Sequence, residues 1–101
     1  MADERRNKPR LDMVRAARVV FDGHAVTVRV HDISETGALV SRIPGASVGA
    51  LCVLQIPGHG SAAATITRTS VGKTAIAFPA DEILRAQYGD PIALFKSISE
   101  A

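Results

Sequence analysis

The stretch from His24 to Val40, HAVTVRVHDISETGALV, contains the pattern that decides the fold. Val26, Val28 and Val30 recur at every second position, which is the period of a strand with one buried face. A second apolar run, ALV, closes the stretch, and the residues DISETG at positions 32–37 separate the two runs. The pattern predicts two paired strands. It leaves open whether DISETG is only a turn between them or also a site.

Strand patterns continue along most of the chain. Asp22-Gly23 is a strong hairpin signal, because a tight turn there requires positive φ angles. Small residues at alternate positions, among them Ala62, Ala64, Ala75 and Ala77, suit a tight barrel interior. The predicted strands cover residues 14–21, 24–31, 38–42, 51–56, 62–69 and 74–78. Six short strands at this spacing predict an antiparallel β-barrel or sandwich.

The first residues differ from this β region. Residues 1–12 are dense in charge, contain Pro9 and have little to bury, so we expect a flexible basic N-terminal arm. Residues 13–101 are then expected to form one domain, because a chain of 101 residues can bury one core but not two.

The last part of the chain has helical signals, and we expect a C-terminal helical segment over about residues 80–101. Asp81 is placed to cap a short helix after Pro79 ends the last strand. Asp90 followed by Pro91 resembles an N-cap with proline in the first helical turn. One face of this last helix is expected to pack on the barrel.

Composition excludes several classes of protein. Hydrophobic residues make up 47% of the chain and aromatic residues only 4%, with no Trp. Scarce aromatics and a net charge of only +2 argue against a nucleic-acid-binding surface, because bases need stacking partners and phosphates need a broad basic face. No apolar segment is long enough for a membrane span, and the first residues do not resemble a signal peptide. We therefore expect a cytoplasmic protein.

Catalytic and metal-binding sets are not evident in the sequence. Cys52 stands in the apolar run LCVLQI and is expected to be a buried thiol. His24, His31 and His59 are too scattered for a metal site, although His31 adjoins Asp32. Ser34 has no evident base to activate it. The chain is expected to be neither an enzyme nor dependent on a cofactor or metal.

DISETG can be read in two ways. As a turn, its acid and hydroxyl groups would bond nearby amides and its glycine would adopt positive φ. As a site, Asp32 and Ser34 would point the same way from a strand end, because they are two residues apart. Gly37 would then allow a ligand or another backbone to approach closely. A carboxylate accepts hydrogen bonds from the N1–H and amine of guanine, and a hydroxyl can donate to phosphate.

Arg6-Asn7-Lys8-Pro9-Arg10 also has two interpretations. A short basic run is commonly a solvated tail. Arginine, however, binds phosphate or the edge of guanine through two parallel hydrogen bonds, and its planar face stacks on purines. Two arginines four positions apart, in an arm that contains proline, can hold one ligand from two sides.

Taken together, the two stretches resemble the signature of the PilZ domain family. Arg6 and Arg10 match its R-x-x-x-R motif, with Arg5 supplying the doubled arginine often found there. Asp32, Ser34 and Gly37 match its D-x-S-x-x-G motif. The order of six strands and a terminal helix also fits this family. The resemblance thus implies a six-stranded antiparallel β-barrel with a C-terminal helix.

The resemblance also implies a function. PilZ domains bind cyclic di-GMP, a bacterial second messenger with two phosphates and two guanines. By resemblance, Arg6 and Arg10 would clasp phosphates and guanine edges, Arg5 would be a further ligand-binding residue, and the D-x-S-x-x-G residues would form the barrel-side surface. A stand-alone receptor that changes shape and signals to an unidentified partner protein is the expected function, in motility, biofilm or exopolysaccharide control. The alternative is a ligand-independent PilZ-type adaptor, and a small nucleic-acid-binding barrel is a distant third.

Overall fold

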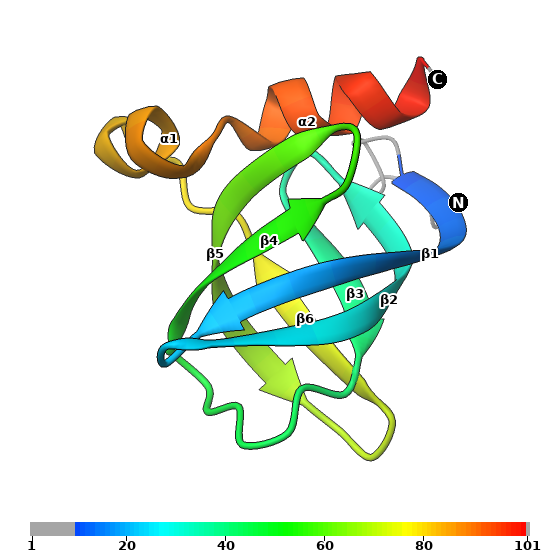
Figure 1. Cartoon of the computed structure of the whole chain (residues 1–101), viewed down its shortest axis with the longest axis vertical. Helices are drawn as coiled ribbons and strands as arrows, with labels where there is room; N and C mark the ends of the chain where they lie inside the picture. The colour runs from blue at the N-terminus through cyan, green and yellow to red at the C-terminus, as the bar shows by residue number, and fades with distance from the viewer. Residues whose placement is uncertain (1–9, 101) are drawn as a thin grey trace, which may run out of the picture.

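Six antiparallel strands close into a barrel, and two helices follow the last strand (Figure 1). The computed structural model describes residues 10–100, with side chains described from residue 15 onward. The strands are β1 (Arg10–Phe21), β2 (His24–Ser34), β3 (Gly37–Ser41), β4 (Leu51–Ile56), β5 (Gly60–Thr69) and β6 (Lys73–Ala77). The helices are α1 (Glu82–Tyr88) and α2 (Pro91–Ser99). Around the barrel the order is β1-β2-β3-β6-β5-β4, and β1 pairs with β4 to close it.

The turn between β1 and β2 has the geometry that its sequence predicts. Asp22 has a φ of 52° and Gly23 a φ of 78°. Positive φ at both central residues gives the turn type whose twist matches that of the flanking strands. The two strands consequently stay paired from this turn back to Arg10 and Ser34, apart from one irregularity near His31.

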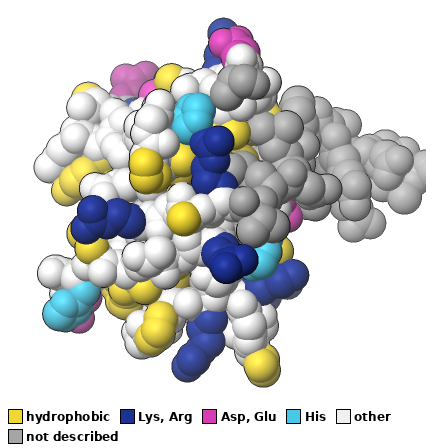
Figure 2. Space-filling view, turned by 45° about the vertical axis from the view of Figure 1, so that its right-hand side comes forward, with side chains coloured by type: hydrophobic (Ala, Val, Ile, Leu, Met, Phe, Trp, Pro, Cys, Tyr) yellow, Lys and Arg dark blue, Asp and Glu magenta, His cyan; other side chains and the backbone are white. Residues whose placement is uncertain are grey.

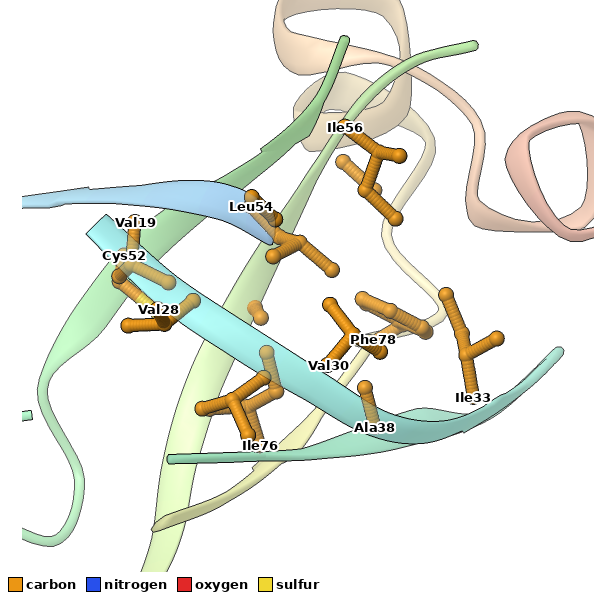
Figure 3. Packing of buried hydrophobic residues seen from close by; sticks show 14 of the residues in the cluster. Val19, Val28, Val30, Ile33, Ala38, Cys52, Leu54, Ile56, Ile76 and Phe78 are labelled. Atoms are coloured by element: carbon orange, nitrogen blue, oxygen red, sulfur yellow. The ribbon is translucent and has the colours of Figure 1, made fainter. Parts of the chain in front are cut away.

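The barrel interior is filled almost entirely by aliphatic side chains. Figure 3 shows side chains from different strands pointing into the same interior. The side chains buried most completely are those of Val19, Val30, Ile33, Val40, Leu54 and Ile66, each with an exposed fraction of 0%. Ala62 and Ala64 are also fully buried. Small and branched side chains fill most of this narrow interior, and Phe78 and Phe95 are the aromatic side chains buried with them.

Helix α2 covers one end of this barrel (Figure 1). Asp90 begins the helix by accepting a hydrogen bond from the Ile92 N–H at 3.0 Å, and Pro91 occupies its first turn. Leu94 and Phe95 are buried in the barrel core. A second contact joins His59 Nδ1 to Ser97 Oγ at 2.7 Å. The apolar face of α2 therefore closes the end at which β1 begins and β2 ends.

The six-stranded antiparallel barrel and the helices after Asp81 and Asp90 are confirmed. Strand β1, however, begins at Arg10 rather than Val14, and β2 extends to Ser34. The arm expected over residues 1–12 thus overlaps β1 in its last three residues. Residues 1–9 lie outside the described residues, so the arm itself stays a prediction.

The expectation that Ala75 and Ala77 face the interior is wrong. Both are partly exposed, whereas Ile76, on the other face of β6, and Phe78, directly after the strand, are 3% and 7% exposed. Turning the larger apolar side chains inward buries more apolar area, which favours this orientation of β6. Thr74 is also buried, and its hydroxyl accepts a hydrogen bond from the Ile43 N–H at 3.1 Å.

Candidate functional site

A β-bulge at His31 decides which way the DISETG residues point. On the β3 side, Val30 pairs with Val40 but Asp32 pairs with Leu39, so His31 has no partner in the ladder. The pairing of β2 with β1 shifts at the same place. An extra residue in a strand reverses the face to which the following side chains point.

The burial pattern shows this reversal directly. Val28 and Val30 are buried at even positions, and Ile33 is buried at an odd position. Without the bulge, Asp32 and Ser34 would continue the inward series of the valines and would place a carboxylate in the core. With it, Ile33 fills the core and Asp32 and Ser34 share the outer face. The prediction that these two side chains point the same way agrees with the geometry of β2.

Strand pairing brings the two sequence motifs together. Arg10 pairs with Ser34 across β1 and β2, and Asp12 pairs with Asp32. The last residue of R-x-x-x-R therefore lies beside the middle of D-x-S-x-x-G, although 23 residues separate them in the sequence. Arg5 and Arg6 lie outside the described residues. Among the described ones, the barrel edge over residues 32–37 and the start of β1 form the candidate site.

Ser34 is more buried than we expect for a residue on a ligand-binding surface, with an exposed fraction of 8%. Its hydroxyl accepts a hydrogen bond from the Thr36 N–H at 3.2 Å and lies 3.2 Å from Thr36 Oγ1. It also donates to the Gly37 carbonyl oxygen at 3.4 Å. A serine hydroxyl has one proton to donate and two lone pairs, so these contacts use its full capacity. Ser34 thus stabilises the turn that carries the other site residues.

Gly37 permits a close approach of two backbones. A Cβ placed on Gly37 would stand 2.5 Å from the Ile76 carbonyl oxygen of β6, closer than Cβ atoms come to other atoms. Gly37 does not have a positive φ, so the turn conformation is not the reason for glycine here. Of the two roles considered for Gly37, access for another backbone is the one that the geometry supports.

The candidate site is connected to the helical end of the chain. The Thr36 carbonyl oxygen accepts a hydrogen bond from the Phe78 N–H at 2.9 Å. Phe78 is buried in the core, and three residues later Asp81 caps α1. Sequence analysis missed Thr36, because a backbone carbonyl carries no signal in the side-chain pattern. A displacement of the turn at residues 35–36 would pass directly to the segment that leads into α1.

Charge is unevenly distributed along the barrel. The sequence has no Asp or Glu between Glu35 and Asp81, whereas Arg42, Arg68 and Lys73 fall within that interval. Figure 2 shows Lys and Arg side chains spread over this side of the barrel, with most of the Asp and Glu side chains in view near the helical end. The outer surface of the barrel therefore favours an anionic ligand over a cationic one.

The described part of the chain contains no metal-binding cluster, no reactive cysteine and no membrane-spanning helix. No group of three or more His, Cys, Asp or Glu side chains among these residues could hold a metal ion. Cys52 is buried, as expected, and burial raises the pKa of its thiol to about 11, which leaves it protonated and unreactive near neutral pH. No described helix is both long and apolar enough to cross a membrane.

Comparison with known proteins identifies one family. The family model described as the PilZ domain matches residues 4–87, which include both sequence motifs and all six strands. A search of curated proteins found no match.

Proposed function

The chain belongs to the PilZ domain family, and on this basis we propose that it is a receptor for cyclic di-GMP. PilZ domains are binding or adaptor domains rather than enzymes, and no catalytic step is proposed. The ligand would bind on the outer face of the barrel, against the β1–β2 pair and the turn at residues 35–36. The candidate residues remain Arg5, Arg6, Arg10, Asp32, Ser34 and Gly37.

The pairing of Arg10 with Ser34 is the observation that carries this proposal. Cyclic di-GMP is a compact dianion, so cations and hydrogen-bonding groups must meet on one surface to bind it. Arg6 is four residues before Arg10, and an extended chain of that length spans at most about 14 Å. The guanidinium groups of Arg6 and Arg10 would therefore reach the same ligand, and Arg5, one residue before Arg6, would add a third cation.

Each candidate group has a distinct part in recognition. Arginine side chains would form bidentate hydrogen bonds with phosphate oxygens or with the O6 and N7 edge of guanine. The Asp32 carboxylate would accept from guanine N1–H and N2–H. The Ser34 hydroxyl donates at 3.4 Å to Gly37, longer than most O–H···O hydrogen bonds, so a phosphate oxygen can compete for that proton. Gly37 would contribute by holding β3 close to β6.

Signalling would follow from ordering of the arginines around the ligand. A bound dianion gives Arg5, Arg6 and Arg10 a common partner and draws the residues before β1 onto the barrel. The hydrogen bond from Phe78 to Thr36 offers a second route, because it links the turn to the helical segment. A downstream protein would then recognise the ligand-bound surface, in motility, biofilm or exopolysaccharide control.

Isothermal titration calorimetry with cyclic di-GMP tests the proposal. We expect saturable binding, with a stoichiometry that distinguishes one ligand from an intercalated pair. Hydrogen exchange should show increased amide protection at residues 6–10 and 32–37 on ligand addition, and little change in α2. A folded protein that gives no heat and no change in exchange at high ligand concentration would favour the alternative, a ligand-independent adaptor.

A further inference from the structure

The end of the barrel opposite α2 exposes aliphatic side chains on two loops. Val71, at the tip of the β5–β6 hairpin, is 95% exposed, and Val48, in the β3–β4 loop, is 65% exposed. Leu51, at the start of β4, is 49% exposed. These are three of the five large hydrophobic side chains that the described residues expose, and Ile83 and Ile92 on the helices are the others. Figure 1 shows both loops at the end of the barrel away from the helices.

Basic side chains flank these loops. Arg42 follows β3, Arg68 lies near the end of β5, and Lys73 begins β6, and all three are exposed. The Arg42 N–H donates to the Gly72 carbonyl oxygen at 3.1 Å, which holds the base of the first loop against the hairpin. Figure 2 shows hydrophobic side chains beside Lys or Arg side chains at the lower end of the molecule.

Acidic groups are nearly absent from this end. The β3–β4 loop and the β5–β6 hairpin lie wholly within the interval between Glu35 and Asp81 that contains no Asp or Glu. Asp22, in the β1–β2 turn, is the acidic residue that the described strands place at this end. Three exposed cations therefore face solvent around two aliphatic tips, with one carboxylate nearby.

From this arrangement we propose that the end of the barrel carrying Val48 and Val71 docks on the surface of an anionic lipid bilayer. The valine tips would enter the boundary between headgroups and acyl chains, and Arg42, Arg68 and Lys73 would contact anionic headgroups. The candidate site for cyclic di-GMP lies at the opposite end, where β1 begins. A docked molecule would thus keep that site open to the surrounding solution.

A lipid surface fits these side chains better than a nucleic acid or an acidic protein. Nucleic-acid surfaces combine cations with aromatic side chains that stack on bases, and residues 42–50 and 68–73 contain no aromatic side chain. Aliphatic side chains at 65% and 95% exposure gain little from an acidic protein surface. Their burial is most favourable in an apolar medium that single projecting side chains can enter without a matching pocket.

Vesicle co-sedimentation without any dinucleotide tests this docking. The protein should pellet with vesicles of phosphatidylcholine and phosphatidylglycerol, and not with phosphatidylcholine alone. Replacing one cation should lower the partition coefficient about fivefold, so the Arg42→Gln, Lys73→Gln double variant should lower it about twenty-five-fold. Val71→Ser should weaken binding several-fold. Added salt should also release the protein, because surface electrostatic attraction is screened.

Matched controls lie on the helices. Lys96→Gln removes an exposed cation and Ile83→Ser an exposed aliphatic side chain from the other end of the molecule, and neither should change vesicle binding. All the substituted residues are exposed, and circular dichroism would verify folding. The proposal is overturned by failure to bind anionic vesicles at low salt, by equal binding to both vesicle types, or by equal losses in the Lys96→Gln control. If the Val71→Ser variant bound vesicles as tightly as the parent, the insertion of the valine side chains into the bilayer would be overturned.

Discussion

Arg10 and Ser34 are directly paired residues of β1 and β2. Their pairing turns two separate sequence motifs into one surface, because opposed residues in an antiparallel ladder have Cα atoms about 4.5–5.5 Å apart. Asp12 and Asp32 pair two positions away, and the bulge at His31 follows immediately. The ladder thereby concentrates the motif residues at the end of the barrel beneath α2.

Removal of an arginine should weaken cyclic di-GMP binding. Arg10→Ala removes a charge-assisted bidentate contact worth roughly 1.5–3 kcal/mol, or about ten- to a hundredfold in affinity. Arg6→Ala should behave similarly, and calorimetry would measure both. Arg68→Ala, at the other end of the barrel, removes the same charge and should leave affinity unchanged. Binding as tight in both motif variants as in the parent would show that these arginines take no part.

Asp32 should select guanine. Asp32→Ala is expected to weaken cyclic di-GMP by about ten- to a hundredfold, since a charge-assisted acceptor is lost. Asp32→Asn keeps one acceptor oxygen and should retain part of the affinity. Competition with a cyclic dinucleotide that carries adenine tests base recognition, because adenine lacks the N1–H donor. Equal affinity for the two dinucleotides would mean that only charge is recognised.

Cys52 should make stability fall at alkaline pH. Burial raises the pKa of its thiol to about 11 from 9.0. The unfolded chain therefore releases the proton first, so the stabilising contribution is complete below pH 9.0 and is lost as pH rises through about 11. The loss is at most about 3 kcal/mol, because one pKa unit corresponds to about 1.4 kcal/mol.

Urea denaturation would measure the free energy of unfolding of the parent and of Cys52→Ala below and above this pH range. Because the two proteins share all other titrating groups, their comparison isolates the contribution of the Cys52 thiol. The variant will be less stable at neutral pH, because a buried side chain is shortened. The difference in the free energy of unfolding between the two proteins should become smaller as pH rises. A difference that stays constant with pH would argue against a protonated, buried thiol.

The barrel could be predicted from the sequence because its information is local. Alternation of Val26, Val28 and Val30 and the Asp22-Gly23 turn each depend on neighbouring residues. The caps at Asp81 and Asp90 are equally local, and both form the hydrogen bonds expected of them. Such features need no knowledge of distant contacts, so a single sequence is sufficient to predict them.

The details of the site depended on distant contacts. The bulge at His31 follows from pairing with two other strands at once, so alternation alone would place Asp32 in the core. The close approach of Gly37 to Ile76 joins β3 to β6, which are separated by two intervening strands in the sequence. The start of β1 at Arg10 likewise depends on its partner Ser34, because charged residues there give no strand pattern.

Ser34→Ala should destabilise the protein even without ligand. The substitution removes hydrogen bonds to Thr36 and Gly37 from an 8% exposed site, at a cost of about 1–2 kcal/mol. Thermal unfolding of the free protein would measure this as a fall in Tm of several degrees. Ser70→Ala removes one exposed hydroxyl bond, to the Lys73 carbonyl oxygen, and serves as the control with little expected effect. An unchanged Tm for Ser34→Ala would show that its hydroxyl is held for ligand rather than for the turn.

Gly37→Ala should destabilise the barrel by forcing β3 away from β6. The added methyl would stand 2.5 Å from the Ile76 carbonyl oxygen, and a paired backbone cannot give way as a flexible side chain can. We expect a loss of about 1–3 kcal/mol, or roughly 4–8 °C in Tm for each kcal/mol. Gly72→Ala is the matched control, since a Cβ there meets nothing within 4 Å and Gly72 has no positive φ.

Ligand affinity of Gly37→Ala, measured below its Tm, should fall because the displaced strand β3 moves the turn at residues 35–36 with it. A variant as stable as the parent would contradict the β3–β6 spacing, and a variant that loses stability but keeps full affinity would assign Gly37 to the fold alone.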